Sequence, residues 1–191
     1  MITVGNLDID DVSCDYCFGN IKWQFKCFSF SSSSYSGQNS ISGDNLEFWG
    51  EVQLNGWVWS DIKRSNNYLY LTTLSGWTYK FDINSKLKSL SLEWEQELKY
   101  DGKPLGGVTL YTHRNQNYLA IPFDKDKVVI LDAINGIVVG EFPLKDGVLS
   151  NPIVLNGLLY LTDKENRFQS FSLGDRSLIK CFDLEDMKGC N

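Results

Sequence analysis

The feature of this sequence that most restricts its fold is a pattern that occurs twice, 40 residues apart, over residues 108–142 and 148–182. Each copy holds four short apolar runs, rich in β-branched and aromatic residues, separated by turn sequences such as Asn156-Gly157. Such runs predict four antiparallel strands joined by tight turns. Equivalent positions carry similar residues with no gap between the copies: Val108 and Val148, Leu131 and Phe171, and Phe142 and Phe182.

A repeat of about 40 residues with four strands is typical of a β-propeller blade. The chain shows the same pattern earlier, because Tyr68–Leu71 matches Tyr118–Ile121 at a spacing of 50, with the extra residues placed in the hairpins 60–67 and 84–91. Closed propellers need about four to eight blades, which 191 residues barely supply. We therefore expect an all-β fold, a β-propeller of about three and a half four-stranded antiparallel blades that forms a partial ring.

The expected organisation starts in mid-blade. Ile2–Asp10 and Ile21–Cys27 read as a third and a fourth strand, with Asp10–Asn20 as an insertion between them, and Leu46–Leu54 reopens the strand pattern. Glu93–Leu98 suits an outer strand better than a helical turn. The predicted parts are a half blade (1–28), a Ser-rich loop (29–45), a blade with long loops (46–100), two further blades (101–145 and 146–185) and a tail (186–191).

Two glycine-bearing pairs, Gly106-Gly107 and Asp146-Gly147, lie 40 residues apart, each just before a first strand. Glycine is the residue that most readily adopts a positive φ. We expect both pairs to form backbone turns of that kind near the propeller axis.

Charge excludes two classes of partner. The net charge is −6, and the 18 Lys and Arg residues are scattered along the chain. A protein that binds the phosphate backbone gathers a basic face, so we expect neither nucleic acid nor an anionic membrane as a partner. The start of the sequence lacks the basic and apolar regions of a secretory signal, and no apolar run is long enough to span a bilayer. These features predict a cytoplasmic location.

The five cysteines are Cys14, Cys17, Cys27, Cys181 and Cys190. In a cytoplasmic protein the simplest interpretation is reduced thiols, some of them on strands. Cys14 and Cys17 form a CxxC motif that suits half a zinc site or a redox pair, with Cys27 as a third possible ligand. No second CxxC follows, and the single histidine, His113, is distant in sequence. We therefore assign no metal site.

No catalytic constellation is visible. Asp82 and Asp132 fall in predicted turns, where a carboxylate commonly accepts hydrogen bonds from its own backbone. His113 falls in a predicted hairpin, where we expect it to be solvated. Neither Ser-His-Asp spacing nor a phosphate-binding glycine loop occurs. The sequence thus predicts no catalytic, cofactor-binding or metal-binding residue, and the aromatic residues are expected to fill the space between sheets.

The segment Ile130-Leu-Asp-Ala-Ile-Asn-Gly136, followed by an outer strand, resembles the blade signature of the PQQ-like, or quinoprotein-type, β-propeller repeat. Ser150–Tyr160 resembles the first two strands of that repeat. The likeness covers residues 103–183 well, 46–98 loosely and 2–27 in outline. It departs from the pattern at the docking tryptophan, whose place falls near Gly140 and Lys180. It also lacks the adjacent cysteine pair of the quinone-dependent dehydrogenases, so no quinone or other cofactor is expected.

Two carriers of such repeats resemble the chain further: the outer-membrane assembly lipoprotein, a propeller scaffold, and the C-terminal propeller of the aminoadipate-semialdehyde-dehydrogenase-like acyl-adenylating synthetases. The resemblance implies a non-catalytic interaction or scaffold module with a protein partner, bound through the loops 10–20 and 29–45. The alternative is a C-terminal accessory propeller fragment of a larger acyl-adenylating enzyme. Because a partial ring leaves apolar blade faces uncovered, we also expect the isolated chain to self-associate or to stay partly unfolded.

Overall fold

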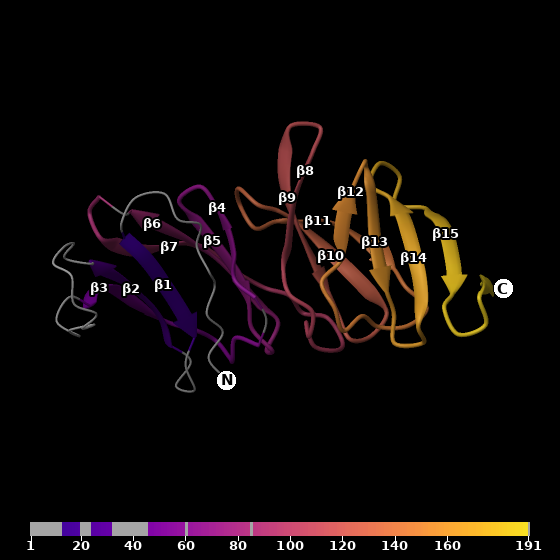
Figure 1. The fold of residues 1–191 in the computed structure, drawn as a ribbon, viewed down its shortest axis with the longest axis horizontal. Helices are drawn as coiled ribbons and strands as arrows, with labels where there is room; N and C mark the ends of the chain where they lie inside the picture. The colour runs from indigo at the N-terminus through magenta and orange to yellow at the C-terminus, as the bar shows by residue number, and fades with distance from the viewer. Residues whose placement is uncertain (1–12, 20–23, 32–45, 60, 85, 191) are drawn as a thin grey trace, which may run out of the picture.

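The computed structural model describes residues 13–19, 24–31, 46–59, 61–84 and 86–190. Regular structure within these ranges consists of β-strands in four antiparallel sheets (Figure 1). None of these segments forms a helix with the length and apolarity needed to cross a membrane. The predicted all-β class is confirmed.

The strands of the first two sheets are these. The first sheet contains β1 (Ser13–Gly19), β2 (Gln24–Ser31) and β3 (Leu46–Gln53), and the second contains β4 (Lys63–Ser65), β5 (Tyr68–Thr72), β6 (Trp77–Asn84) and β7 (Ser89–Glu97).

The third and fourth sheets follow in chain order. The third contains β8 (Thr109–His113), β9 (Gln116–Pro122), β10 (Lys127–Asp132) and β11 (Val138–Pro143), and the fourth contains β12 (Ile153–Leu155), β13 (Leu158–Thr162), β14 (Arg167–Ser172), β15 (Leu178–Asp183) and β16 (Lys188–Gly189).

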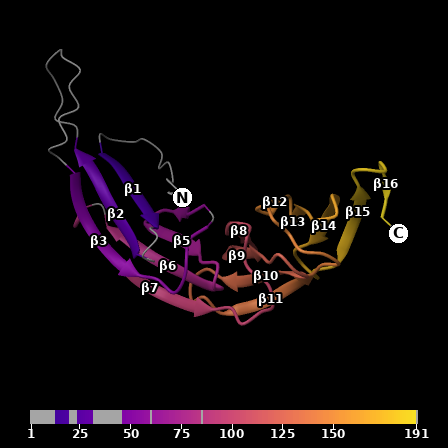
Figure 2. The ribbon, with the colours of Figure 1, turned by 90° about the horizontal axis from the view of Figure 1, so that it is seen from below.

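The sheets stack in chain order into an open arc, with β3, β7, β11 and β15 on its convex side (Figure 2). The predicted partial ring is therefore confirmed. All four sheets share a register shift between the strand on the convex side and its neighbour, for example between Ile130 and Leu131 and between Ser170 and Phe171. Such a bulge increases strand twist, and its recurrence shows that the sheets are copies of one unit.

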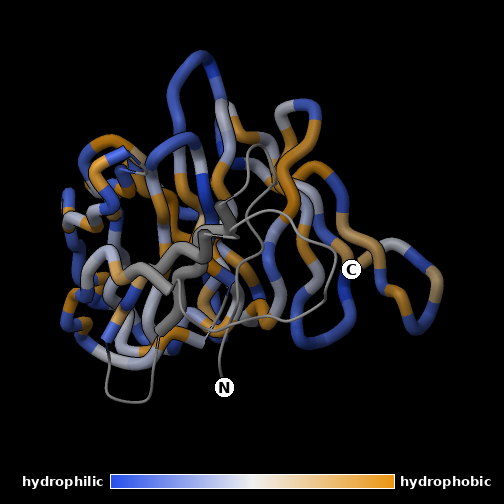
Figure 3. Tube along the Cα trace, turned by 60° about the vertical axis from the view of Figure 1, so that its left-hand side comes forward, coloured by the Kyte–Doolittle hydropathy of each residue, from blue (hydrophilic) through white to orange (hydrophobic). Residues whose placement is uncertain are grey.

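Apolar cores fill the spaces between neighbouring sheets. Figure 3 shows hydrophobic and hydrophilic stretches along the chain. In an inner strand such as β10, consecutive residues are apolar and buried, because successive side chains point to opposite faces and each face meets a core. Phe25, Trp49 and Phe81 belong to the core between the first and second sheets. Tyr70, Leu119 and Val129 belong to the second core, and Val128, Phe142 and Phe171 to the third.

Tight turns join the inner strands. Both turn residues have positive φ in the β8–β9 hairpin (Arg114 at 49° and Asn115 at 62°) and in the β12–β13 hairpin (Asn156 at 51° and Gly157 at 77°). This conformation belongs to the two-residue hairpin turn that Asn-Gly favours. The turn predicted at Asn156-Gly157 is confirmed.

The N-terminal half departs from the predicted organisation by one strand. Asp10–Asn20 was expected to be an inserted loop, but residues 13–19 form β1, and Ile2–Asp10 lies outside the described residues. Leu46–Leu54 was expected to open a new blade, but β3 pairs with β2 and is the outer strand of the first sheet. The second sheet instead begins at the polar β4, which an apolar pattern cannot reveal. Residues 89–97 do form the expected outer strand β7.

The expected positive φ at Gly106, Gly107 and Gly147 is wrong, because none of the three has one. Glycine is required there by close approach. A Cβ at Gly106 would lie 2.6 Å from the Ser150 carbonyl oxygen, and one at Gly147 would overlap the backbone carbonyl group of Asp124. These glycines let the connections between neighbouring sheets pass against one another.

Candidate interaction site

An open groove of about 500 Å³ lies between the end of β11 and the strands β14, β15 and β16. Phe171 and Leu178 supply apolar surface, and Leu178 is 52% exposed although it is a large aliphatic side chain. Charged side chains share the lining: Lys145, Arg167, Arg176, Asp183, Asp186 and Lys188. The groove thus offers apolar surface surrounded by charges of both signs.

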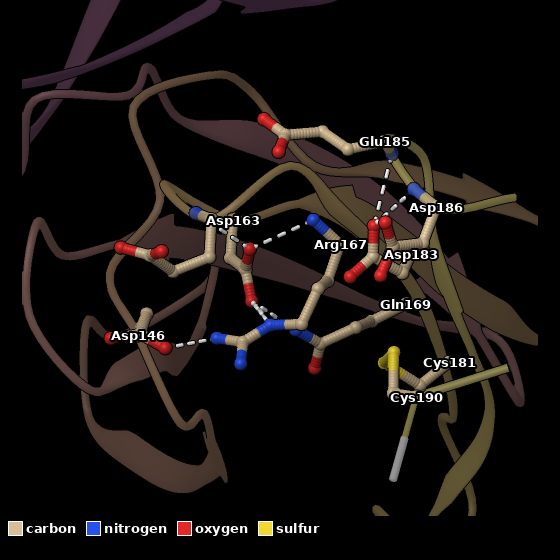
Figure 4. Close-up of a disulfide and its surroundings, with 10 residues drawn as sticks. Asp146, Asp163, Arg167, Gln169, Cys181, Asp183, Glu185, Asp186 and Cys190 are labelled. Atoms are coloured by element: carbon tan, nitrogen blue, oxygen red, sulfur yellow. Dashed lines mark hydrogen bonds and ion pairs between the residues drawn. A yellow bond between two sulfur atoms is a disulfide. The ribbon is translucent and has the colours of Figure 1, made fainter. Parts of the chain in front are cut away.

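A buried carboxylate anchors one wall of the groove (Figure 4). The side chain of Asp163 is fully buried, and its oxygens accept hydrogen bonds from the Arg167 guanidinium at 2.8 Å and from the Gln169 amide at 2.6 Å. Backbone N–H groups of Glu165 and Arg167 donate to the same carboxylate, each at 3.0 Å. Arg167 also pairs with Asp146. Both oxygens of the buried Asp163 carboxylate are therefore hydrogen-bonded, as a buried charge requires.

Two charged groups at this wall, Arg167 and Asp183, have pKa values shifted in favour of their ionised forms. Burial lowers the pKa of Arg167, but the hydrogen bonds to Asp163 and Asp146 outweigh it and raise the pKa above its ordinary value. Asp183 accepts hydrogen bonds from the backbone N–H groups of Asp186 and Glu185, which lower its pKa. Neither group is poised to exchange a proton near neutral pH, so both serve to hold the wall in place.

A disulfide between Cys181 on β15 and Cys190 closes the far end of the groove, with the two Cα atoms 5.3 Å apart (Figure 4). It fastens the C-terminal segment, in which Lys188–Gly189 pairs with β15 as the short strand β16. The structure places β16 within residues 186–191, which were expected to be a tail. Cys181 and Cys190 were expected to be reduced thiols, and this interpretation is wrong; the spacing of two cysteines does not reveal that a turn brings them together.

Cys27 on β2 is also disulfide-bonded, so it is not a reduced thiol and supplies no thiolate for a zinc site. The side chains of Cys14 and Cys17 lie outside the part of the chain whose side chains are described. Of the loops expected to carry the interaction surface, 10–20 is largely strand β1, and 32–45 lies outside the described residues.

A second groove of about 280 Å³ lies between the third and fourth sheets near the β8–β9 hairpin. His113 and Asp132 both line this second groove. Arg176 lines both grooves and lies between them. Asp132 accepts a hydrogen bond from the Ile134 N–H at 2.7 Å, which confirms the predicted turn cap. Asp82 instead lies within β6, and Asn84 caps that turn by accepting from the N–H groups of Lys86 and Leu87.

Burial, with a smaller effect of Tyr118, raises the pKa of Tyr111 in the second groove. This tyrosine remains a neutral phenol at physiological pH. Its ring stacks on that of Tyr118, with the ring centres 5.5 Å apart, so both rings serve as packing surface.

Arg176 also replaces the docking tryptophan of the resemblance. Trp94 on β7 packs over Gly136 of the next sheet, where an added Cβ would lie 2.8 Å from the indole. At the next junction the large and the small residue exchange places. Gly140 occupies the ladder position that Trp94 has in the second sheet. Arg176, 40 residues after Gly136, packs over Gly140 and donates a hydrogen bond to the Val139 carbonyl at 2.7 Å. A small residue thus faces a large one at both junctions.

Sequence reasoning assigned none of the groove residues to an interaction site, although a signal was present. Thr73, Phe123 and Asp163 are equivalent, since each backbone N–H bonds to the carbonyl of the residue four positions later. Asp163 and Gln169 therefore stand where the preceding repeat has the buried Phe123 and Val129. Polar residues at such positions mark a buried hydrogen-bonded network.

Comparison with known proteins supports the fold. No protein-family model and no curated protein matches the chain. Among solved structures, the crystal structure of BamB from Moraxella catarrhalis matches with a TM-score of 0.65 and 14% sequence identity, over 96% of this chain and 53% of that one. The likeness identifies the chain as a β-propeller repeat protein that spans about half the length of this neighbour. Nothing found supports the link to the acyl-adenylating synthetases.

Proposed function

We propose that this protein is a non-catalytic interaction module of the β-propeller type, and that the groove between β11 and β14–β16 binds a segment of a partner protein. The observation that carries the proposal is the composition of the groove. The buried ionisable groups at its wall, Asp163 and Arg167, are paired with each other, whereas Leu178 is exposed in the groove. Fixed polar walls beside an accessible apolar side chain suit recognition rather than bond-making chemistry.

The charges around the groove indicate the chemistry of the partner. Asp186 pairs with Lys188 at 2.6 Å, and Asp183 is occupied by backbone donors. Lys145 and Arg176 add positive charge to the lining. The best-matched ligand is an extended segment with an apolar side chain for Leu178 and a carboxylate near Arg176.

Peptide selection tests this proposal. Random 12-residue peptides would be selected on the immobilised chain, and the affinity of the best ones measured by fluorescence anisotropy against the wild type, Leu178→Asp and the control Leu87→Asp. Leu87 is 75% exposed in the β6–β7 hairpin, outside the groove. We expect at least about tenfold weaker binding to Leu178→Asp and unchanged binding to Leu87→Asp, since an apolar contact at the centre of an interface dominates affinity. Equal binding to all three proteins would refute the groove as the site.

The cellular location stays a prediction. A cytoplasmic location was expected from the sequence, and reduced thiols were expected to accompany it; the Cys181–Cys190 disulfide does not fit such a compartment, because disulfides persist mainly in oxidising ones. Thiol trapping in intact cells would decide the matter. The accessory-propeller alternative likewise stays a prediction, and transcript sequence upstream of Met1 tests it.

A further inference from the structure

The two grooves between the third and fourth sheets meet at Arg176. Its side chain lines both of them and donates a hydrogen bond to the Val139 carbonyl at 2.7 Å, which links the two sheets. From there the second groove, of about 280 Å³, continues to the β8–β9 hairpin, where it is lined by Tyr111, His113 and Arg114. A ligand that lies in the first groove with a carboxylate at Arg176 therefore reaches the entrance of the second groove.

The second groove is rich in positive charge. Arg114, Arg176 and His113 share its lining with one carboxylate, Asp132. Asp132 already accepts a hydrogen bond from the Ile134 N–H at 2.7 Å, and neither arginine forms an ion pair with a carboxylate of the described residues. Because the whole chain has a net charge of −6, this lining is a local reversal of charge that suits an anionic ligand.

Tyr111 adds a neutral hydrogen-bond donor beside these cations. Its ring stacks on the ring of Tyr118, whose hydroxyl donates to the Gln116 side-chain oxygen at 2.6 Å. Within the part of the chain that the structure describes, the Tyr111 hydroxyl has no such partner. Burial raises its pKa, so the hydroxyl keeps its proton at neutral pH. A carboxylate is the acceptor that best matches a phenol beside guanidinium groups.

At the preceding junction, between the second and third sheets, a cation of the chain itself occupies the equivalent place. Lys80 holds the ladder position that Ile130 has in the third sheet. Its ammonium nitrogen lies 3.8 Å from the centre of the Tyr68 ring, and the residue is 6% exposed. In the third sheet, Ile130 and the equivalent ring of Tyr118 instead line the second groove. The site is thus a feature of the junction that also carries the first groove.

We propose that the second groove binds an acidic continuation of the partner segment whose apolar side chain contacts Leu178. The ligand is an extended stretch of a partner protein in which several Asp or Glu residues lie on the Arg176 side of the apolar residue. Their carboxylates bind the donors of the second groove. This inference rests on the function proposed above and adds the chemistry of the partner.

Peptide extension tests the inference on the full chain. The best peptide selected for the first groove would carry four added residues at its N- or C-terminus, either all Glu or all Gln, and affinities would be measured by fluorescence anisotropy. At one of the two ends, the Glu extension should bind at least about tenfold more tightly than the Gln extension, because charge-assisted hydrogen bonds are strong.

Three variants locate this gain. Arg114→Glu should reduce it to about twofold or less, and Tyr111→Phe, which keeps the ring, should reduce it about threefold or more. The control Arg64→Glu makes the same change of charge on β4, outside both grooves, and should keep the whole gain. Unchanged far-UV circular dichroism would show that each variant is folded, and Tyr111→Phe gives the check if Arg114→Glu disturbs the hairpin.

The outcomes distinguish this inference from the proposed function. Equal affinity of the Glu and Gln extensions at both ends, a gain that Arg114→Glu and Tyr111→Phe retain, or a gain that Arg64→Glu also abolishes would each overturn the inference. The proposed function would still stand in these cases if Leu178→Asp weakened binding of the Gln-extended peptide. If Leu178→Asp had no effect on that peptide, both proposals would fall.

Discussion

The third and fourth sheets are built alike and differ in their neighbours. The four strands of the third sheet and the first four of the fourth have the same order and a bulge at equivalent positions. Yet Val128 and Phe142 are 0% and 1% exposed, whereas their equivalents Phe168 and Phe182 are 39% and 36% exposed. The repeat pattern specifies which face is apolar. The presence of a next sheet decides whether that face is buried.

The energetic difference follows from burial. At about 25 cal/mol per Å² of apolar surface removed from water, the covered face of the third sheet contributes to folding, and the equivalent face of the fourth sheet, with Phe168 and Phe182 partly exposed, contributes less. The predictions below either sharpen or break this contrast between the two sheets.

The largest contrast is expected between Phe142→Ala and Phe182→Ala. Phe142 lies in a closed core, so its truncation should lower the free energy of unfolding by about 3–5 kcal/mol. The equivalent Phe182 is partly exposed in a single copy, and its truncation should cost less than about 1.5 kcal/mol. Urea unfolding followed by tryptophan fluorescence at low protein concentration measures both. Losses of equal size would break the contrast.

A second contrast concerns Arg167 and Lys127, which are 40 residues apart. Arg167→Met should destabilise by about 3 kcal/mol, since it leaves the buried Asp163 carboxylate without its cation. Lys127→Met removes a partly exposed pair with Glu141, 3.4 Å away, and should cost less than about 1 kcal/mol. The same unfolding assay applies. If Arg167→Met were as mild as Lys127→Met, the network would not hold the groove wall.

The disulfide distinguishes the fourth sheet from the third. Cys190→Ser opens a loop that closes over 9 residues, so stability should fall by about 2 kcal/mol. Unfolding with and without reductant measures this, and the reductant should have no further effect on the C-terminal segment of the variant. Fast hydrogen exchange at β16, with unchanged exchange at β10, would localise the loss to this end of the arc.

The smallest effect concerns pH. Backbone N–H groups of Asp186 and Glu185 lower the pKa of Asp183, so its ionised form is favoured by folding. This contribution is complete above the ordinary aspartate pKa and is lost as the pH falls through the lower folded pKa. Stability of Asp183→Asn should therefore depend less on pH below about 4 than that of the wild type. Identical pH profiles for the two proteins would contradict the role of Asp183.

Much of the fold could be predicted because the strands of the last two sheets are apolar and regularly spaced. The first half could not be aligned in this way. The inner strand β4, Lys63-Arg-Ser65, has no apolar residue, and β3 follows a stretch whose length hides its pairing with β2. Without β4, the sequence pattern assigns Leu46–Leu54 to the second sheet, whereas β3 is the outer strand of the first sheet.

The groove could not be predicted from single residues, because it exists only where two sheets meet. Asp163 and Arg167 are ordinary turn residues in the sequence, and only the alignment with Phe123 and Lys127 reveals a polar pair at a core position. The Cys181–Cys190 pairing depends on the turn of residues 184–187, which returns the chain to β15. Such relations become visible when the ladder register is known.

The central claim is that the fourth sheet repeats the third, but that no sheet among the described residues covers its face with Phe168 and Phe182. Side-chain footprinting with hydroxyl radicals tests this claim directly. Phe168 and Phe182 should be labelled much faster than Phe142, in line with their exposure, and Leu87, 75% exposed, gives the upper reference. Labelling of Phe168 and Phe182 as slow as that of Phe142 would contradict the claim.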